Sequence, residues 1–305
     1  MKVFLTGATG FVGKTLLQRL LKEGHAVRAA LRGNGTGARL VQSFHREGDF
    51  QYVAGDVVSG KGLEEGMDGC DAVIHLVGII VEKGSNTFES VHHLGTRNVV
   101  DAARKRGMKR FVHMSAVGAR ADGVADYQTT KWRGEEEVRH SGIPYCILRP
   151  SLIFGNGGFV DEMTGVMRKA PLFRPVPGDG RSKFRPVSNE DVALCFARSL
   201  TSDAAAGQTI DLGGADELTL NQVLNEIAIA AGIEKPAVNI PMSLMKIGAR
   251  FAQLLSTPPV TVGQLRMLEE GSTCDIGPMQ QIFNFAPESF CGWGERMARV
   301  SVRTP

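Results

Sequence analysis

One stretch near the start of the chain constrains its fold more than any other. Residues 2–6 (Lys-Val-Phe-Leu-Thr) form a short run rich in β-formers, which predicts a buried parallel strand. Gly7, Gly10 and Gly13 follow directly, and leucines then recur at helical spacing until Gly24, a typical helix-terminating residue. Such glycines often mark only a turn, but between a strand and a helix they let the backbone approach a pyrophosphate at the helix N-terminus. The stretch therefore predicts a dinucleotide-binding loop.

Apolar runs recur along the first two thirds of the chain and alternate with helical patterns. The runs that predict further strands are residues 26–31, 51–56, 71–77, 110–114, 145–148 and 208–212. Helices are expected over residues 88–106, where Val91, Leu94 and Val99 share one face, and near residues 131–140. Strands that alternate with helices predict an α/β fold with a doubly wound parallel sheet of the Rossmann type.

The composition of the sequence changes after Pro150, where glycine and proline become frequent. Loops are expected at residues 154–158 and 171–186, and in this fold the loops beyond the strand ends build the substrate side. Farther on, Thr219 and Gln222 have the spacing of a capping box, which predicts the start of a helix. The second part of the chain should therefore differ in architecture from the first.

These patterns predict two domains of unequal size. Residues 1–155 should form the dinucleotide-binding domain, with residues 184–214 returning to it. Residues 156–183 and 215–305 should form a smaller, mostly helical lobe on the substrate side. An apolar helix is expected after Pro241, and its apolar side chains are Leu244, Ile247, Phe251, Leu254 and Leu255. We expect this helix in the core, the alternative being a lipid- or quinone-facing surface.

Charge and cysteine usage narrow the class of protein. The 305 residues carry 35 Lys and Arg against 32 Asp and Glu, a net charge of +3, which argues against nucleic acid as the partner. The five cysteines are dispersed without a Cys-x-x-Cys pair, as is typical of reduced intracellular thiols. No leader segment is expected, and no apolar stretch reaches the roughly 20 residues that span a bilayer. We predict a cytoplasmic protein, with peripheral contact at the inner face of a membrane as the alternative.

The end of the second strand bears on the choice of nucleotide. In NAD-binding folds an acidic residue about 20 residues past the glycines holds the ribose 2′-hydroxyl. Here residues 29–32 (Ala-Ala-Leu-Arg) contain no carboxylate, and Arg28 and Arg39 are nearby. The guanidinium of Arg32 can bind a 2′-phosphate, which favours NADP(H) over NAD(H), although a solvated loop arginine is the alternative. Asp56, after the third strand, is either a contact of the adenine or an ordinary turn residue.

A Tyr-x-x-x-Lys pattern, formed by Tyr127 and Lys131, marks the candidate reacting end. Two side chains four residues apart lie on one face of a helix. A free phenol has a pKa of about 10, and a neighbouring ammonium, together with an oxidised nicotinamide, should lower it. Lys131 can also bond the nicotinamide ribose, and Ser115, at the end of the fifth strand, can hold the substrate oxygen. The alternative, a half-exposed helix tyrosine, loses weight because the pattern follows the fifth strand of an array that begins with the glycine loop.

Together these motifs occur in the order of a known family. They are Gly7–Gly13, 74–76 (Ile-His-Leu), 95–98 (Gly-Thr-Arg-Asn), 111–115 (Phe-Val-His-Met-Ser), Tyr127 with Lys131, 148–150 (Leu-Arg-Pro) and 184–187 (Phe-Arg-Pro-Val). Over roughly residues 1–215 the chain resembles the extended or atypical short-chain dehydrogenases of the NAD-dependent epimerase/dehydratase type. Within that superfamily, residues 74–80 and the short interval from Ser115 to Tyr127 are most similar to the nucleotide-binding accessory subunit of respiratory complex I and its bacterial relatives.

The residue patterns and the resemblance together assign a dinucleotide site. Its expected residues are Gly7, Thr9, Gly10, Phe11, Val12, Gly13, Arg32, Asp56, Val57, His75, Leu76, Val77, Lys131 and Pro150. His75, within an apolar strand, should be an interior histidine that contacts the cofactor rather than a base. The resemblance implies tightly held NADPH and little turnover. At the position where many family members carry a proton-relaying asparagine stands His92, which we expect to be a surface histidine.

Two classes of function stay open. The first is an oxidoreductase or epimerase-type enzyme in which Ser115, Tyr127 and Lys131 act on a carbonyl or hydroxyl group of a small molecule. The second is a non-catalytic NADPH-binding accessory subunit or assembly factor of a respiratory or quinone-related complex, since such relatives also keep Tyr-x-x-x-Lys. No His, Cys or Asp cluster has metal-ligand spacing, and no Ser/His/Asp set indicates hydrolysis. Polar outer faces on the helices that flank the fifth strand predict a monomer, or at most a weak dimer.

Overall fold

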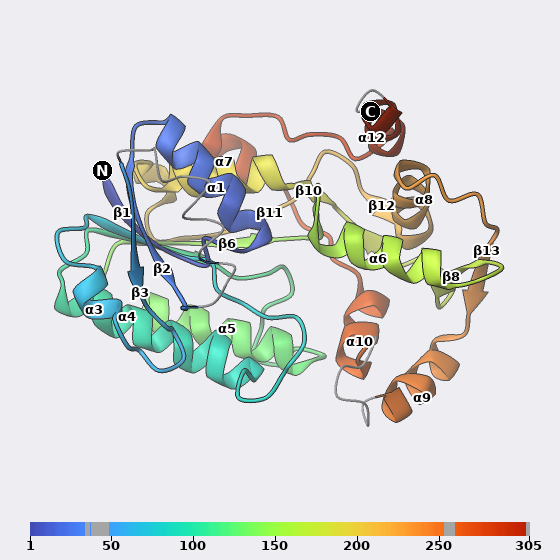
Figure 1. Cartoon of the computed structure of the whole chain (residues 1–305), viewed down its shortest axis with the longest axis horizontal. Coiled ribbons are helices and arrows are strands. Elements are labelled where there is room, and N and C mark those ends of the chain that lie inside the picture. The colour runs from blue at the N-terminus through green and yellow to red at the C-terminus, as the bar shows by residue number, and fades with distance from the viewer. Residues whose placement is uncertain (34–36, 38–48, 253–259, 303–305) are drawn as a thin grey trace. The chain divides into compact units, whose positions relative to one another are not determined.

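A computed structural model of the chain describes residues 1–33, 37, 49–252 and 260–302 (Figure 1). The chain divides into two compact units. The first unit comprises Met1–Arg149, Asn189–Asp211 and Pro278–Asn284, and the second comprises Pro150–Ser188, Leu212–Gly277 and Phe285–Pro305. Both units are therefore built from segments that are far apart in the sequence.

A seven-stranded sheet forms the centre of the first unit. Its strands, in spatial order, are β11 (Gln208–Leu212), β6 (Tyr145–Pro150), β5 (Arg110–Met114), β4 (Ala72–His75), β1 (Lys2–Thr6), β2 (Ala26–Leu31) and β3 (Phe50–Ala54). Neighbouring strands from β6 to β3 pair in parallel. The doubly wound α/β sheet predicted from the sequence is thus confirmed. The strand order reverses between β1 and β4, the place where such sheets bind ligands beyond the carboxyl ends of their strands.

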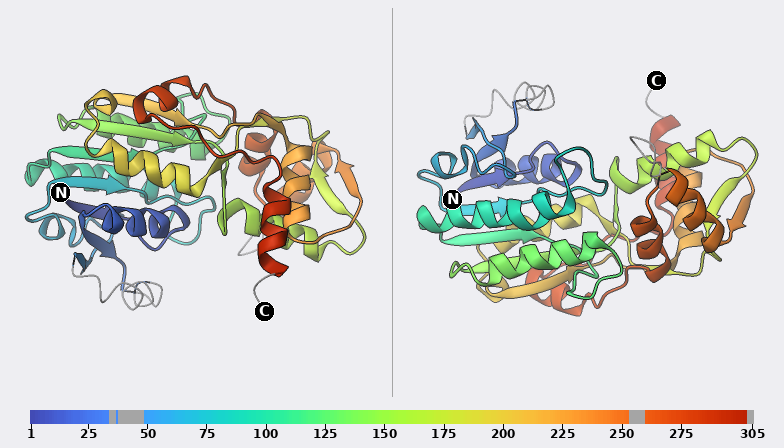
Figure 2. Two further views of the ribbon diagram at one scale, coloured as in Figure 1. Left: turned by 90° about the horizontal axis from the view of Figure 1, so that it is seen from above. Right: turned by 90° about the horizontal axis from the view of Figure 1, so that it is seen from below.

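Helices cover both faces of this sheet (Figures 1 and 2). On one face α1 (Phe11–Lys22) packs against α7 (Asn189–Ser199), and α1 buries Leu16, Leu17 and Leu20 toward the strands. On the other face lie α3 (Leu63–Gly66), α4 (Gly95–Lys105) and α5 (Asp126–Arg139), which also contact one another in sequence order. The short helices η2 (Asp203–Ala205) and α11 (Gly277–Phe283) also belong to this unit. Burial of apolar side chains on both faces explains why these strands read as nearly continuous apolar runs.

The expected helix over residues 88–106 is not one regular helix. Residues Glu89–Leu94 form a π-helical segment, η1, and α4 begins only at Gly95. The helix α5 packs closely against η1, and a side chain at Gly134 of α5 would collide with the carbonyl oxygen of His92. The prediction of a surface histidine at position 92 is wrong, because His92 is only 1% exposed. The docking of α5 on η1 buries a position that would face water on an isolated helix.

The second unit combines short strands with helices. Its strands β7 (Ile153–Phe154) and β10 (Val187–Ser188), and β8 (Arg174–Pro177) and β13 (Ala237–Ile240), pair in parallel, whereas β9 (Lys183–Phe184) and β12 (Leu218–Thr219) pair antiparallel. Its helices are α6 (Gly158–Lys169), α8 (Leu220–Ala230), α9 (Met242–Ala252), α10 (Val262–Glu270) and α12 (Trp293–Val302). Thr219 and Gln222 form the predicted capping box at the start of α8. The core of this unit includes Phe154, Phe290 and Trp293, whose rings contact one another.

The helix α9 departs from its predicted place in the core. Leu244, Ile247 and Phe251 are each more than half exposed, whereas Ala249 on the opposite face is buried. The core prediction is therefore wrong for these three side chains, because α9 buries only the face that carries Ala249. Leu254 and Leu255, which were expected to continue the apolar stripe, lie outside the described residues. Within the described ranges, no helix is both long enough and apolar enough to cross a bilayer.

Candidate functional site

The glycine turn between β1 and α1 is shaped by backbone contacts. Gly7 has a φ of 82°, which favours glycine, and a methyl group there would stand 3.1 Å from Leu76 of the segment after β4. A methyl group at Gly13 would collide with the carbonyl oxygen of Gly7, to which the Gly10 N–H donates (3.0 Å). Gly10 caps α1 without a side-chain hydrogen bond, so the first N–H groups of the helix have no capping side chain. The turn thus offers unblocked N–H groups and the positive end of the helix dipole, as an anion site requires.

The remaining predicted residues of this turn occupy two environments. Thr9 and Phe11 are partly exposed, whereas Val12 is buried in the start of α1. A ligand that reaches the turn can therefore touch the first two side chains and only the backbone of the third.

The arginines near the end of β2 are used differently. The Arg28 guanidinium donates to the carbonyl oxygens of Gly66 (3.0 Å) and Asp68 (2.7 Å), so its side chain serves the packing of the α3 region. Arg32 follows the last residue of β2 and is exposed. Arg39 lies outside the described residues. The exposed Arg32 is therefore the described arginine that is available to a ligand at this strand end.

Asp56 lies in the turn that follows β3, and its carboxylate holds that turn together. It accepts hydrogen bonds from the backbone N–H groups of Val58 and Ser59 (both 3.3 Å) and from the Ser59 hydroxyl (2.9 Å). The neighbouring Val57 is buried, and its carbonyl oxygen accepts a hydrogen bond from the Asn98 side chain (2.9 Å). These contacts match the alternative in which Asp56 is a turn residue, and a role toward adenine stays a prediction.

His75, the last residue of β4, lies fully in the interior and has a partner at each ring nitrogen. The Thr96 hydroxyl donates to the carbonyl oxygen of His92 (2.7 Å), so it accepts from His75 Nε2–H (3.2 Å). Nδ1 of His75 then accepts from the Thr6 hydroxyl of β1 (2.7 Å). Burial, with the nearby charge of Lys131, lowers the pKa of His75 to about 3. His75 is neutral, as an interior histidine should be, and Leu76 and Val77 continue from it past the glycine turn.

Lys131 and Ser115 both lie at the carboxyl end of β5. The Lys131 ammonium is 2% exposed and donates to the carbonyl oxygen of Met114, the last residue of β5 (2.9 Å). Burial lowers the pKa of Lys131 to about 8, against the opposing effect of the Glu135 carboxylate. Ser115 comes next in the chain, is buried, and has no hydrogen-bond partner for its hydroxyl among the described residues. A buried hydroxyl without a partner beside a buried ammonium is a place where a ligand oxygen could be held.

Tyr127 lies one turn before Lys131 on α5, as the spacing predicts. Its ring contacts Phe88 (5.9 Å between centroids) and His92 (5.2 Å) edge to face. Tyr127 is partly exposed, and the desolvation of its hydroxyl raises its pKa to about 12. The expectation that Lys131 lowers this pKa is wrong for the chain by itself, because desolvation of the phenolate dominates and the ammonium is directed at Met114. Tyr127 is accordingly a neutral phenol over the physiological range of pH.

His92, which was expected at the surface, is a buried member of this cluster. Its ring contacts Tyr127, and its Nε2 accepts a hydrogen bond from the N–H of Ile79 (3.0 Å). The regular helical period gave no signal for its burial, because residues Glu89–Leu94 form a π-helical segment.

The comparisons with known proteins agree with this geometry. Residues 7–203 match the profile of a family described as NAD(P)H-binding, which is more than half of the chain. The chain belongs to the NAD(P)H-binding family. The ceramide reductase of Caulobacter vibrioides (strain NA1000 / CB15N) is 32% identical over 286 residues, which cover 92% of this chain and 88% of that protein. The family resemblance inferred from the motifs is thereby confirmed.

Other relatives of this NAD(P)H-binding protein are longer. The mitochondrial NADH dehydrogenase (ubiquinone) 1 alpha subcomplex subunit 9 of Arabidopsis thaliana is 28% identical over 219 residues, which cover 71% of this chain and 54% of that protein. The chain therefore spans about half the length of that relative, and 58% of the 3beta-hydroxysteroid-dehydrogenase/decarboxylase isoform 2 of the same plant. Among solved structures, UDP-glucuronic acid 4-epimerase from Bacillus cereus in complex with UDP-glucuronic acid and NAD superposes with a TM-score of 0.74, at 18% identity, covering 99% of this chain and 100% of that one. This last similarity shows the fold.

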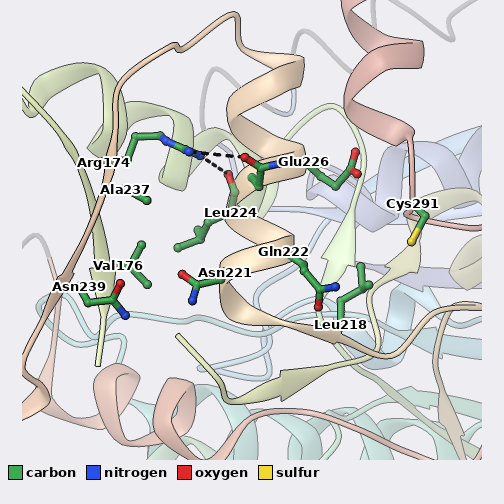
Figure 3. A pocket seen from close by; sticks show the side chains of 11 residues that line it. Arg174, Val176, Leu218, Asn221, Gln222, Leu224, Glu226, Ala237, Asn239 and Cys291 are labelled. Carbon is green, nitrogen blue, oxygen red and sulfur yellow. Dashed lines mark hydrogen bonds between the residues drawn. The ribbon is translucent and has the colours of Figure 1, made fainter. Parts of the chain in front are cut away.

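The second unit of this NAD(P)H-binding protein has a cavity of its own, of about 510 Å³ (Figure 3). It lies along α8 and the β8–β13 pair, with Asn221, Gln222 and Asn239 among its lining residues. Arg174 at its end donates to the carbonyl oxygen of Lys235 (2.8 Å). None of the residues predicted for the dinucleotide or for proton transfer lines it. Pro150, the last of the predicted dinucleotide residues, belongs to this second unit.

Proposed function

We propose that this chain is an NADP(H)-dependent oxidoreductase or epimerase-type enzyme that acts on a carbonyl or hydroxyl group. The observation that supports this most is the group of polar side chains at the end of β5. There the buried ammonium of Lys131, one helical turn from the phenol of Tyr127, donates to the carbonyl oxygen of Met114. Ser115 is the next residue, and its hydroxyl has no hydrogen-bond partner among the described residues. All three groups belong to the first unit, which also carries the glycine turn.

In the reductive direction Ser115, Tyr127 and Lys131 would each have a different role at the carbonyl oxygen of the substrate. The dinucleotide, when bound, supplies the hydride that goes to the carbonyl carbon. Ser115 would donate a hydrogen bond to the carbonyl oxygen, and Tyr127 would transfer its phenolic proton to that oxygen as negative charge develops. The phenol is protonated at neutral pH, as a donor must be, but desolvation raises its pKa to about 12 and so makes it a weak acid until the phenolate is stabilised. Lys131, which is charged below a pH of about 8, would stabilise the phenolate that remains.

The preference for NADP(H) is part of this proposal. The end of β2 presents the exposed Arg32 and no carboxylate, and a guanidinium binds a phosphate group by charge-assisted hydrogen bonds. NAD(H) is the alternative, and the NAD complex of the epimerase named above has the same fold.

A second function, an NADPH-binding subunit without turnover, is favoured by the relatives themselves. Besides the Arabidopsis subunit, the mitochondrial 40 kDa subunit of NADH-ubiquinone oxidoreductase from Neurospora crassa is 26% identical over 241 residues. In this case the dinucleotide would be a structural ligand, and Tyr127 would have no reaction to serve. We place either form in the cytoplasm as a monomer. The alternative to a purely cytoplasmic location is peripheral contact with a membrane, which the exposed apolar face of α9 would allow.

One experiment separates the two functions. The protein is purified without added nucleotide, and any dinucleotide it carries is identified by mass. The complex reconstituted with NADPH is then mixed with a panel of quinones, ketones and nucleotide sugars while absorbance follows oxidation of the cofactor. Oxidation by one member of the panel supports the enzyme, whereas retention of NADPH without oxidation by any member contradicts it in favour of the subunit.

A further inference from the structure

The imidazole of His92 joins two elements of the first unit through hydrogen bonds of opposite sense. Its Nε2 accepts from the backbone N–H of Ile79, in the segment that follows β4 (3.0 Å). Its Nδ1 lies 3.2 Å from the hydroxyl of Thr130 on α5. Because the Thr130 hydroxyl already donates to the carbonyl oxygen of Asp126 (2.6 Å), it accepts from His92 Nδ1–H. Both ring nitrogens are therefore committed, and the ring is the neutral Nδ1–H tautomer.

The same ring touches the groups that would perform the chemistry. Tyr127 stands against it edge to face, with 5.2 Å between ring centroids and 88° between planes. Phe88 stacks on it at 5.4 Å. At Gly78, one residue before Ile79, an added methyl group would lie 3.0 Å from Lys131 Nζ and 3.6 Å from His92 Nε2. The segment after β4 thus passes close to both His92 and Lys131.

The surroundings of the ring keep it uncharged. Burial is the main reason that the pKa of His92 falls to about 2, and the charge of Lys131 on α5 acts in the same direction. His75 is itself neutral, and its Nε2–H reaches the His92 carbonyl oxygen through the hydroxyl of Thr96. Along this chain each hydrogen has one acceptor, so the network is fully satisfied and has a fixed direction. Because the links end at backbone groups, the N–H of Ile79 and the carbonyl oxygen of His92, which do not take part in proton transfer at neutral pH, the network holds positions.

We infer that His92 is a positioning residue, a neutral imidazole that ties the segment after β4 to α5 and so sets where Tyr127 and Lys131 stand. This deepens the proposed function and rests on it for the link to turnover, but the tie between Ile79 and Thr130 does not depend on turnover. It also assigns the His92 side chain a role other than proton relay, because Nε2 accepts from a backbone N–H, which does not release its proton.

The test uses variants that remove one or both hydrogen bonds. His92→Phe keeps a ring of similar size but leaves the Ile79 N–H without an acceptor inside the protein. His92→Gln can keep an acceptor near Ile79, and His92→Asn can keep a donor near Thr130. The matched control is His93→Phe, since His93 belongs to the same η1 segment but pairs with Glu89 and Glu137 (both 2.8 Å). It should lower thermal stability and leave NADPH binding unchanged.

The first measurement is NADPH affinity by fluorescence titration. We expect His92→Phe to weaken NADPH about tenfold, which corresponds to a buried hydrogen bond and a displaced segment, and His92→Gln to stay within about twofold of the unmodified protein. If His92→Phe does not fold, the test compares the two other variants. We then expect His92→Gln to bind NADPH more tightly than His92→Asn. Equal affinities across the folded variants would overturn the inference.

The second measurement is the protonation state of the ring by ¹⁵N NMR, with the His92 signals assigned by their loss in His92→Gln. A neutral ring with the proton on Nδ1 between about pH 5 and 9 supports the inference, and a ring that titrates in this range or carries its proton on Nε2 overturns it. Where a substrate is found, kcat of His92→Gln should fall without a shift of either limb of the pH profile. Absence of turnover in every variant contradicts the proposed enzyme and leaves the affinity and NMR results to decide on His92.

Discussion

The glycine turn and the reacting end of the first unit are built in opposite ways. The turn is contiguous in sequence and consists mainly of backbone. Its shape requires glycine at Gly7, which has a positive φ, and at Gly13, where a methyl group would collide with the backbone. The reacting end gathers side chains from η1, α5 and the residue after β5, and its properties come from burial and from hydrogen bonds between these elements. A site made from backbone can be read from local spacing, whereas a site made from buried side chains depends on how the elements pack.

The largest expected effect is a loss of turnover when Tyr127 is changed, without a change in NADPH binding at the glycine turn. Tyr127→Phe removes one hydroxyl and keeps the ring contacts with Phe88 and His92. If the protein is an enzyme, turnover should fall by roughly 10²–10⁴, the usual contribution of a positioned proton donor. NADPH affinity should barely change, as measured by titration beside the rate. The control is Tyr52→Phe, at an exposed tyrosine, and full activity in Tyr127→Phe would remove Tyr127 from the mechanism.

The next effect concerns the far end of the dinucleotide. Arg32→Ala should weaken NADPH binding about tenfold or more, because a charge-assisted pair with a phosphate contributes roughly 1.5–3 kcal/mol. NADH binding should stay nearly the same, since it lacks the 2′-phosphate. Parallel titrations of both nucleotides measure this. Arg28→Ala is the control, since Arg28 donates to the carbonyl oxygens of Gly66 and Asp68, and identical curves for NADPH and NADH in the unmodified protein would contradict the assignment.

A change in the turn should affect binding and stability together. Gly13→Ala places a methyl group against the Gly7 carbonyl oxygen and 2.8 Å from Ala8 Cα, an overpacking that costs about 1–3 kcal/mol. Urea unfolding should show the loss, and NADPH affinity should fall with it. The matched control is Gly165→Ala in α6, where the added methyl group meets open space and should be neutral or slightly stabilising. A fully stable Gly13→Ala that binds NADPH normally would show that the turn can relax.

The smallest expected effect is a pH dependence that belongs to the reacting end. The pKa of Lys131 is about 8 in the folded chain against an ordinary 10.5, so above pH 8 the unfolded chain holds a proton that the folded chain has lost. Stability should therefore rise with pH by about 1–2 kcal/mol between about pH 8 and 10. Above about pH 10 the raised pKa of Tyr127 acts in the opposite direction, because the unfolded chain then loses a proton that the folded chain keeps.

The difference in unfolding free energy between the unmodified protein and Lys131→Met isolates this contribution, because the other titrating groups cancel. We expect that difference to change in favour of the unmodified protein as the pH rises. A difference that stays constant from about pH 7.5 to 9.5 would contradict a lowered pKa for Lys131. The same variant should also impair NADPH binding, since Lys131 is expected to serve the nicotinamide ribose.

The sequence predicted the sheet well, because each buried strand carries its own apolar run. The strands at 26–31, 110–114 and 208–212 have the bounds observed for β2, β5 and β11. The helix after the fourth strand was less predictable. Residues Glu89–Leu94 form a π-helical segment, against which α5 packs closely at Gly134, and no distinct sequence period marks this segment. The misplacement of His92 is a direct result of that packing.

By itself the sequence determined the parallel sheet, the glycine turn at Gly7–Gly13 and the spacing of Tyr127 and Lys131, because these depend on residues that are neighbours along the chain. Only the tertiary structure decided that His92 is buried, that Arg28 is occupied while Arg32 is exposed, and that the face of α9 with Phe251 is exposed. It also decided that Tyr127 has a raised pKa and Lys131 a lowered one. The reason is that burial and desolvation depend on which surfaces meet, and local periodicity shows only that a surface is apolar.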